Sequence, residues 1–213
     1  MARASELLAV AAKQLGVRES PPGSNKVRYN TWYYGKEVQG GGYPWCMTFV
    51  QWVFDQAGVK LPRRTASCGD LMRAAQAAGC WVTKNFLPGD IAIFNFPGGA
   101  ATDHCGIIEA VTASGVISIE GNTGSSSDAD GGQVQRRERP AKYIVGAVRP
   151  DYDKEDNLAR YNSVQECPEW ARKTVQKLID KGYLNGTGAG LDLSADMTRL
   201  LVILDRAGNF DKE

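Results

Sequence analysis

The chain has 213 residues, of which 43% are hydrophobic and 23% are charged, an ordinary globular composition. Its formal net charge of +1 is divided unevenly, with +4 on residues 1–150 and −3 on residues 151–213. Neither part has the strongly basic cluster that neutralises nucleic-acid phosphates, so we expect no nucleic-acid partner. No apolar run approaches the roughly 18–20 residues that span a bilayer, so we expect no membrane partner.

The first half of the chain predicts three helices, because apolar residues recur at helical spacing over residues 5–16, 44–57 and 68–78. Between the first two helices, residues 20–43 are rich in glycine and proline but also contain several aromatic side chains. A solvated linker is rarely so aromatic, and we expect this stretch to be a loop that lines a cleft.

The second half of residues 1–150 predicts short strands, at residues 91–96, 106–111, 116–120 and 143–148. Helices followed by several successive strands favour an α+β domain with an antiparallel sheet. We expect one such domain over residues 1–150.

A charged stretch poor in apolar residues, 151–162, predicts a linker. Beyond it, residues 163–213 predict two amphipathic helices separated by a glycine-rich connection at 182–190. So short a segment buries little core alone, and we expect this C-terminal helical module to dock, oligomerise or pack on the main domain.

Cysteine and histidine limit the chemistry available. The five cysteines form no C-x2-C pair and His104 is the one histidine, so we expect no structural zinc site. The odd cysteine count, and an N-terminal apolar stretch interrupted by Glu6 and Lys13, favour reduced thiols in a protein made without a signal peptide. Phosphate-loop and serine-elbow motifs are absent from the sequence.

A thiol and an imidazole remain. Cys46 falls in the first turn of a predicted helix, where unpaired amide N–H groups favour the thiolate. His104 is its natural base, and Glu120 and Asn122, two residues apart at the end of a predicted strand, share a face from which to orient the imidazole. Taken singly, a cysteine or a histidine is more often structural; the combination favours catalysis. We assign the other cysteines to the core: Cys68, Cys80, Cys105 and Cys167.

Four segments in this order resemble the CHAP domain (cysteine, histidine-dependent amidohydrolase/peptidase). They are YPWCMTFVQW at 43–52, LPGDI at 87–91, DHCGI at 103–107 and IEGNT at 119–123. The resemblance implies a papain-like α+β fold, with helices packed on an antiparallel sheet, and hydrolysis of amide bonds in bacterial peptidoglycan. It also implies phage endolysin-like release of the enzyme from the host cytoplasm to the cell wall through a holin pore.

The resemblance assigns Cys46 as the nucleophile, His104 as the general base and then acid, and Glu120 and Asn122 as the residues that orient His104. We expect aromatic side chains near the cysteine to contact the substrate: Trp32, Tyr43 and Trp45.

We expect no cofactor and no calcium dependence. Some CHAP domains bind calcium through an acidic segment before the cysteine, and the corresponding residues 30–35 have no acidic ligand here. Asp128 and Asp130 form a fragment of a calcium-loop pattern without its distal glutamate, and we interpret them as part of a plain loop.

The C-terminal module resembles a single S-layer homology motif, at Gly182-Tyr183-Leu184 and Met197-Thr198-Arg199. Such motifs bind cell-wall polymers as tandem triplets. Only one copy is present, and Leu201 replaces the acidic residue that usually follows the Thr-Arg pair. The module is therefore interpreted as either a wall-binding or a self-association unit, the latter giving a homo-oligomer.

The sequence leaves three functions open. The first is a peptidoglycan hydrolase, either an N-acetylmuramoyl-L-alanine amidase or an endopeptidase of the stem or cross-bridge peptides. Both cut an amide by the same thiolate chemistry, so residue types alone do not separate them. The others are a non-catalytic wall-binding module that keeps the fold and a cysteine protease of ordinary peptides.

Overall fold

The computed structural model describes residues 3–97, 102–125, 127–152, 160–186, 188 and 190–211. The chain divides into two compact units, Met1–Asp153 and Lys154–Glu213. Most of the expected linker, residues 153–159, lies outside the described residues. Among the described residues, no helix is both long and apolar enough to cross a membrane.

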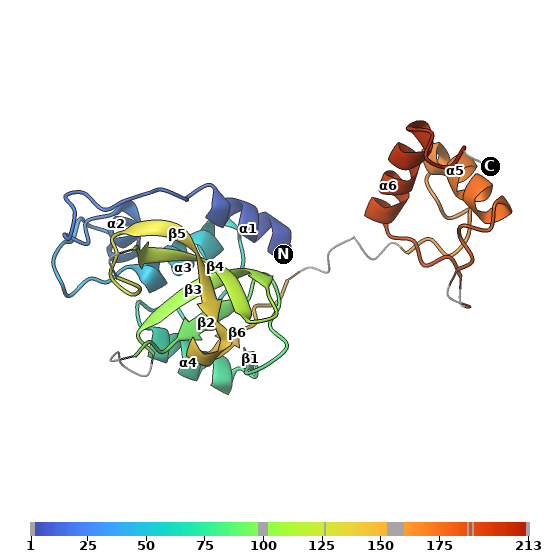
Figure 1. Ribbon diagram of the computed structural model, residues 1–213. Helices are drawn as coiled ribbons and strands as arrows, with labels where there is room; N and C mark the ends of the chain where they lie inside the picture. The colour runs from blue at the N-terminus through green and yellow to red at the C-terminus, as the bar shows by residue number, and fades with distance from the viewer. Residues whose placement is uncertain are drawn as a thin grey trace. The chain divides into compact units, whose positions relative to one another are not determined.

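A six-stranded antiparallel sheet forms the centre of the first unit (Figure 1). Its strands are β1 (Trp81–Val82), β2 (Ile91–Phe94), β3 (His104–Val111), β4 (Gly115–Thr123), β5 (Gln133–Pro140) and β6 (Ile144–Val148). Their spatial order is β1-β6-β2-β3-β4-β5, and every neighbouring pair is antiparallel. A 3-10 turn, η1 (Ala141–Tyr143), joins the last two strands. The predicted α+β class with an antiparallel sheet is confirmed.

Four helices accompany this sheet: α1 (Ala4–Ala12), α2 (Arg28–Tyr34), α3 (Cys46–Gln56) and α4 (Cys68–Ala77). Helix α3 packs on β3, β4, α1 and α2, while α4 packs on β1 and β6. Helix α3 approaches the sheet closely at Gly121, where a Cβ atom would lie 2.6 Å from the Cβ of Phe49. The absence of a side chain at Gly121 thus lets the helix that begins at Cys46 lie against β4.

Apolar side chains cover both faces of the sheet, because successive residues of β2 belong to two different hydrophobic clusters. Ile91 and Ile93 belong to the main core, which they share with α1, α3 and α4. Ala92 and Phe94 belong to a smaller cluster that includes Ile108. Side chains of successive strand residues point to opposite faces, so a sheet with apolar residues on both faces holds its strands between two layers.

Three elements differ from the sequence-based expectation: α2, β5 and β1, whose two residues are too few to give a strand pattern. Residues 28–34 are a helix, not a loop, and the helix ends at Gly35, whose φ of 71° suits glycine. The buried Tyr29 ring packs 5.1 Å from the ring of Phe49, so the aromatic residues of this stretch are partly core residues. Strand β5 was not predicted because its charged run resembles a solvated loop. Its place at the edge of the sheet lets alternate charged side chains face solvent.

The second unit contains α5 (Glu169–Asp180) and α6 (Ala195–Arg206), which pack together. A partly buried hydrogen bond joins them, from the Thr174 hydroxyl to Asp205 Oδ2 at 2.7 Å. The unit has its own small core, to which both helices contribute: Cys167, Ala171, Val175, Leu193 and Val202.

Close packing of β3 against β4 gives a stability prediction. At Gly106 an added Cβ would lie 2.5 Å from Cγ of the buried Glu120, so Gly106→Ala should destabilise the protein by about 1–3 kcal/mol through overpacking. Gly41→Ala is the matched control, since no atom lies within 4 Å of its added Cβ. Urea unfolding of both variants measures the difference, and equal stability would contradict the packing argument.

Candidate active site

Cys46 is the first residue of α3 and is 5% exposed. Hydrogen bonds with the Cys105 and Cys68 thiols, and then the interaction with His104, outweigh the effect of burial and hold the pKa of Cys46 well below its ordinary value. The unpaired N–H groups and dipole at the helix start act in the same direction. These interactions therefore favour the thiolate form of Cys46.

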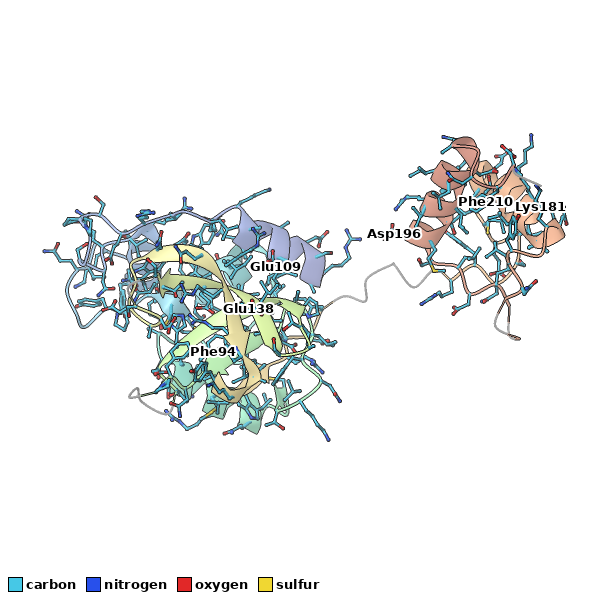
Figure 2. The ribbon with its side chains drawn as sticks, in the orientation of Figure 1. Phe94, Glu109, Glu138, Lys181, Asp196 and Phe210 are labelled. Carbon is cyan, nitrogen blue, oxygen red and sulfur yellow. The ribbon has the colours of Figure 1, made fainter. Side chains whose placement is uncertain are left out.

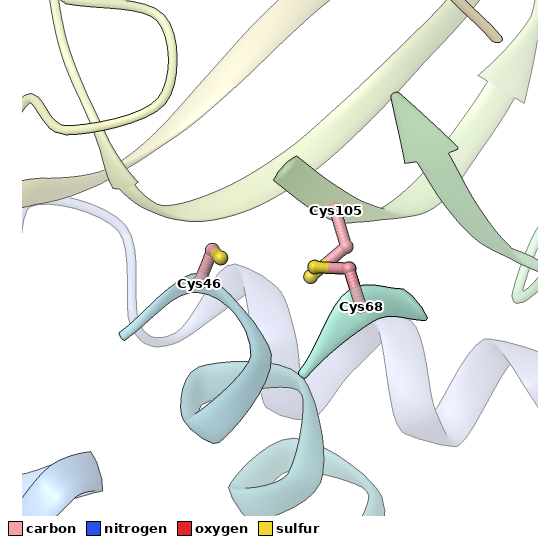
Figure 3. Close-up of side chains that lie close together, drawn as sticks. All are labelled: Cys46, Cys68 and Cys105. Carbon is pink, nitrogen blue, oxygen red and sulfur yellow. The ribbon is translucent and has the colours of Figure 1, made fainter. Parts of the chain in front are cut away.

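Three sulfur atoms gather at this point (Figure 3). The Sγ atoms of Cys46, Cys68 and Cys105 all lie within 4.8 Å of one another, and all three residues are buried. They come from the starts of α3 and α4 and from β3. The hydrogen bond with Cys105 lowers the pKa of Cys68, but the Cys46 thiolate and burial outweigh it and raise that pKa well above its ordinary value.

For Cys105, burial has the largest effect on the pKa. Together with the Cys46 and Cys68 thiols, burial raises the Cys105 pKa well above the usual range. Cys46 is thus the member of the trio that ionises, and Cys68 and Cys105 remain thiols that stabilise it. The expectation that Cys68 and Cys105 are buried holds, but their place beside Cys46 could not be read from sequence spacing.

His104 begins β3 and is completely buried. Its Nε2 atom lies 3.0 Å from Oε2 of Glu120, whereas Nδ1 has no hydrogen-bond partner among the described residues. Burial alone would lower the pKa of His104, but Cys46 and Glu120 raise it to about 9. With Nε2 donating to the carboxylate, Nδ1 is the nitrogen free to exchange a proton with Cys46.

Glu120 is a buried carboxylate held by four donors. Besides His104, Ser118 donates its hydroxyl to Oε1 at 2.6 Å, and Arg139 donates Nε to Oε1 at 2.8 Å and Nη2 to Oε2 at 2.5 Å. Burial raises the pKa of Glu120, but the Arg139 and His104 interactions outweigh it and lower the pKa. Glu120 thus stays ionised and fixes the His104 ring.

Arg139, on β5, was not identified from the sequence. Its side chain is 4% exposed, and its guanidinium lies 4.6 Å from the centre of the Phe96 ring and 2.6 Å from Oδ1 of Asp128. The same hydrophobic layer holds His104, whose ring lies 6.2 Å from that of Phe94. Figure 2 labels Phe94 within the first unit. Arg139 stands in a run of charged residues, and a single sequence does not show which of them is buried.

Asn122 lies near this chain of contacts but bonds elsewhere. Its side-chain amide donates to Oδ1 of Asp130 at 3.1 Å, and its own Oδ1 is buried without a partner among the described residues. The strand pairing is irregular between Glu120 and Thr123, and Asn122 has a φ of 57°. The alternation of side chains between the two faces of β4 is therefore interrupted after Glu120, where the sequence argument relied on it. An orienting role for Asn122 stays a prediction.

The three aromatic residues expected to contact substrate have different environments. Trp45 is completely buried and its indole N–H donates to Glu19 at 3.3 Å, so its side chain is a core residue and not a substrate contact. Trp32 is partly exposed and borders a cavity of about 260 Å³, with the Arg64 guanidinium 4.9 Å from its ring. Tyr43 is partly exposed and packs edge-on against Tyr34.

The comparisons with known proteins agree with this geometry. Residues 38–122, which contain Cys46, His104, Glu120 and Asn122, match the CHAP domain. This segment is therefore similar to the CHAP domain, over less than half of the chain. The comparisons give no support to the S-layer resemblance of the C-terminal module.

Two solved structures are similar to the chain. The crystal structure of the wild-type endolysin LysIME-EF1 has a TM-score of 0.47 at 15% identity, with 72% of this chain and 66% of that chain covered. The crystal structure of Ly7917 has a TM-score of 0.43 at 19% identity, with 69% and 62% covered. The similarity thus spans less than two thirds of either solved chain. No curated protein matches the sequence.

The lowered pKa of Cys46 gives a pH prediction. Above the lowered pKa of Cys46 the thiolate persists, whereas a thiol with an ordinary pKa loses reactivity by roughly tenfold per pH unit below that value. Iodoacetamide should therefore favour Cys46 over Cys80 increasingly as pH falls from about 8.5 to 6, since burial raises the Cys80 pKa. Peptide mass spectrometry measures both rates; parallel losses at the two sites would contradict the assignment.

The buried carboxylate gives a second prediction. Arg139→Gln removes the bidentate partner of Glu120 and leaves that charge undercompensated, which should cost about 3–5 kcal/mol of unfolding free energy. Arg136→Gln, on the same strand, is the matched control because Arg136 is half exposed and pairs with Glu109. Its loss should not exceed about 1 kcal/mol. Similar losses for the two variants in urea unfolding would contradict a buried role for Arg139.

Proposed function

We propose that the chain is a peptidoglycan hydrolase that cuts an amide bond through the Cys46 thiolate. The observation that carries the proposal is the buried series Cys46, His104, Glu120 within a CHAP domain. Keeping a thiolate, an imidazolium and a carboxylate together out of water is costly, and a purely structural site has no use for it. This argues against a non-catalytic wall-binding module.

The mechanism follows from the state of each group. The Cys46 sulfur attacks the amide carbonyl, and the free N–H groups of the first turn of α3 are placed to stabilise the developing oxyanion. The protonated His104 Nδ1 gives its proton to the leaving amine as the C–N bond breaks, which forms a thioester. His104 then takes a proton from water, and the resulting attack releases the acid and restores the thiolate. Glu120 holds the imidazole through both steps.

Loss of either reacting group tests this function. Cys46→Ala and His104→Ala should each lower the clearing of purified cell walls by several orders of magnitude, because the two residues act as a unit. Cys80→Ala and Cys167→Ala are controls, since neither residue belongs to the sulfur cluster. Wild-type clearing by Cys46→Ala would overturn the mechanism.

The substrate is decided by a separate measurement. We expect wall clearing without comparable casein cleavage, whereas efficient casein cleavage would favour a protease of ordinary peptides. Mass spectrometry of digested sacculi identifies the new termini. A free lactyl group on muramic acid means an amidase, and a free amine within the stem or cross-bridge means an endopeptidase.

For the C-terminal module we propose self-association with a second copy of the chain. The helix α6 has three large apolar side chains that the second unit does not cover: Met197, Leu200 and Ile203. Their spacing of three residues puts them along one face of the helix. The net charge of −3 over residues 151–213 also suits an anionic cell wall poorly.

Light scattering on the full chain and on residues 1–153 tests this role. We expect the full chain to be an oligomer, the shorter chain to be a monomer, and Leu200→Glu with Ile203→Glu to dissociate the full chain. Trp170→Glu on α5 is the matched control for an added charge at an exposed apolar residue. A monomeric full chain would exclude self-association, and its sedimentation with purified walls through the module would replace it with wall binding.

A further inference from the structure

The three sulfur atoms around the nucleophile are arranged as metal ligands. A zinc ion bound to thiolates at about 2.3 Å in tetrahedral geometry needs sulfur atoms about 3.8 Å apart. The Sγ atoms of Cys46, Cys68 and Cys105 lie within 4.8 Å of one another, so small rotations of the side chains suffice to bind one ion. Figure 3 shows the three side chains extending from separate elements toward a common space.

The expectation of no metal site rested on cysteine spacing along the chain. That argument does not hold, because the fold joins cysteines from two helix starts and a strand that are far apart in sequence. A second observation points to a ligand at this place. Nδ1 of the completely buried His104, the residue before Cys105, has no hydrogen-bond partner among the described residues.

We propose that Cys46, Cys68 and Cys105 form a binding site for one thiophilic cation, such as Zn²⁺, and that its occupancy switches the enzyme off. Thiolate sulfur is the ligand that zinc and related soft ions prefer. Binding releases to solvent any thiol protons that the three cysteines carry. The inhibitory consequence rests on the proposed function; the binding itself does not.

The exposure of the three cysteines indicates how an ion would reach the site. Cys46 and Cys68 are 5% and 6% exposed, whereas Cys105 is completely buried. An ion entering beside Cys46 therefore meets the first two sulfurs before it reaches the third. Once coordinated, the Cys46 electron pair is no longer available to attack a carbonyl. The site would thus restrain the hydrolase wherever free thiophilic ions are present and release it when a chelator removes them.

Cobalt binding measures the site without reference to activity. The full chain, reduced with a phosphine, should bind Co²⁺ with a stoichiometry of one and show the thiolate-to-cobalt absorption of a tetrahedral site. Zn²⁺ should then displace the cobalt. Cys68→Ser should weaken binding on the order of 100-fold or more, because loss of a ligand costs at least as much as loss of an outer-shell partner. Cys80→Ser and Cys167→Ser are controls that should bind as the wild type does.

Reaction with iodoacetamide gives an independent readout. Zn²⁺ should protect Cys46 from alkylation in the wild type and in Cys80→Ser, and EDTA should restore the reaction. Cys105→Ser tests the buried ligand and is interpreted only where its circular dichroism matches the wild type; Cys68→Ser covers the case in which it does not fold. Absence of stoichiometric cobalt absorption, or undiminished binding by Cys68→Ser, would overturn the site. Wall clearing by the metal-free enzyme tests the proposed function separately.

Discussion

The buried Glu120 carboxylate is the constraint on which the site depends. A charge held out of water is costly unless it is paired and hydrogen-bonded, and here Arg139, Ser118 and His104 satisfy it together. Because Arg139 keeps Glu120 ionised, the carboxylate accepts from Nε2 of His104. That bond leaves Nδ1 toward Cys46, so one ion pair determines which nitrogen takes part in chemistry.

The thiolate depends on a different set of partners. A helix start and two neighbouring thiols stabilise Cys46, while the imidazolium supplies the opposite charge. These groups belong to α3, α4 and β3, and close packing holds the elements in register. Glycines at the points of closest approach, Gly121 against α3 and Gly106 against Glu120, permit that packing. Catalytic geometry and core packing are thus parts of one arrangement.

Much of this could be predicted from the sequence because helical and strand periodicities are local. The helix over residues 44–57, with Cys46 in its first turn, and the strand over residues 106–111, just after His104, follow from short-range patterns. The partnership of His104 with Glu120 was expected from the CHAP resemblance, which offered Asn122 equally. Arg139 and the sulfur cluster could not be predicted, since both depend on contacts between segments far apart in the chain. The expectation that Trp45 contacts the substrate was wrong. The sequence does not distinguish an aromatic residue that faces the substrate from one in the core, whereas the complete burial of Trp45 places it in the core.

The position of Arg139 also bears on how the domain is assembled during synthesis. The ribosome completes Cys46, His104 and Glu120 before β5, and the residues matching the CHAP family end at 122, ahead of the arginine. Until that edge strand pairs with β4, Glu120 lacks its main counter-charge and the imidazole lacks its anchor. A nascent or truncated chain therefore carries all the recognisable motif residues in an unassembled state. The proposed catalytic site is therefore complete only when the last strands of the domain are in place.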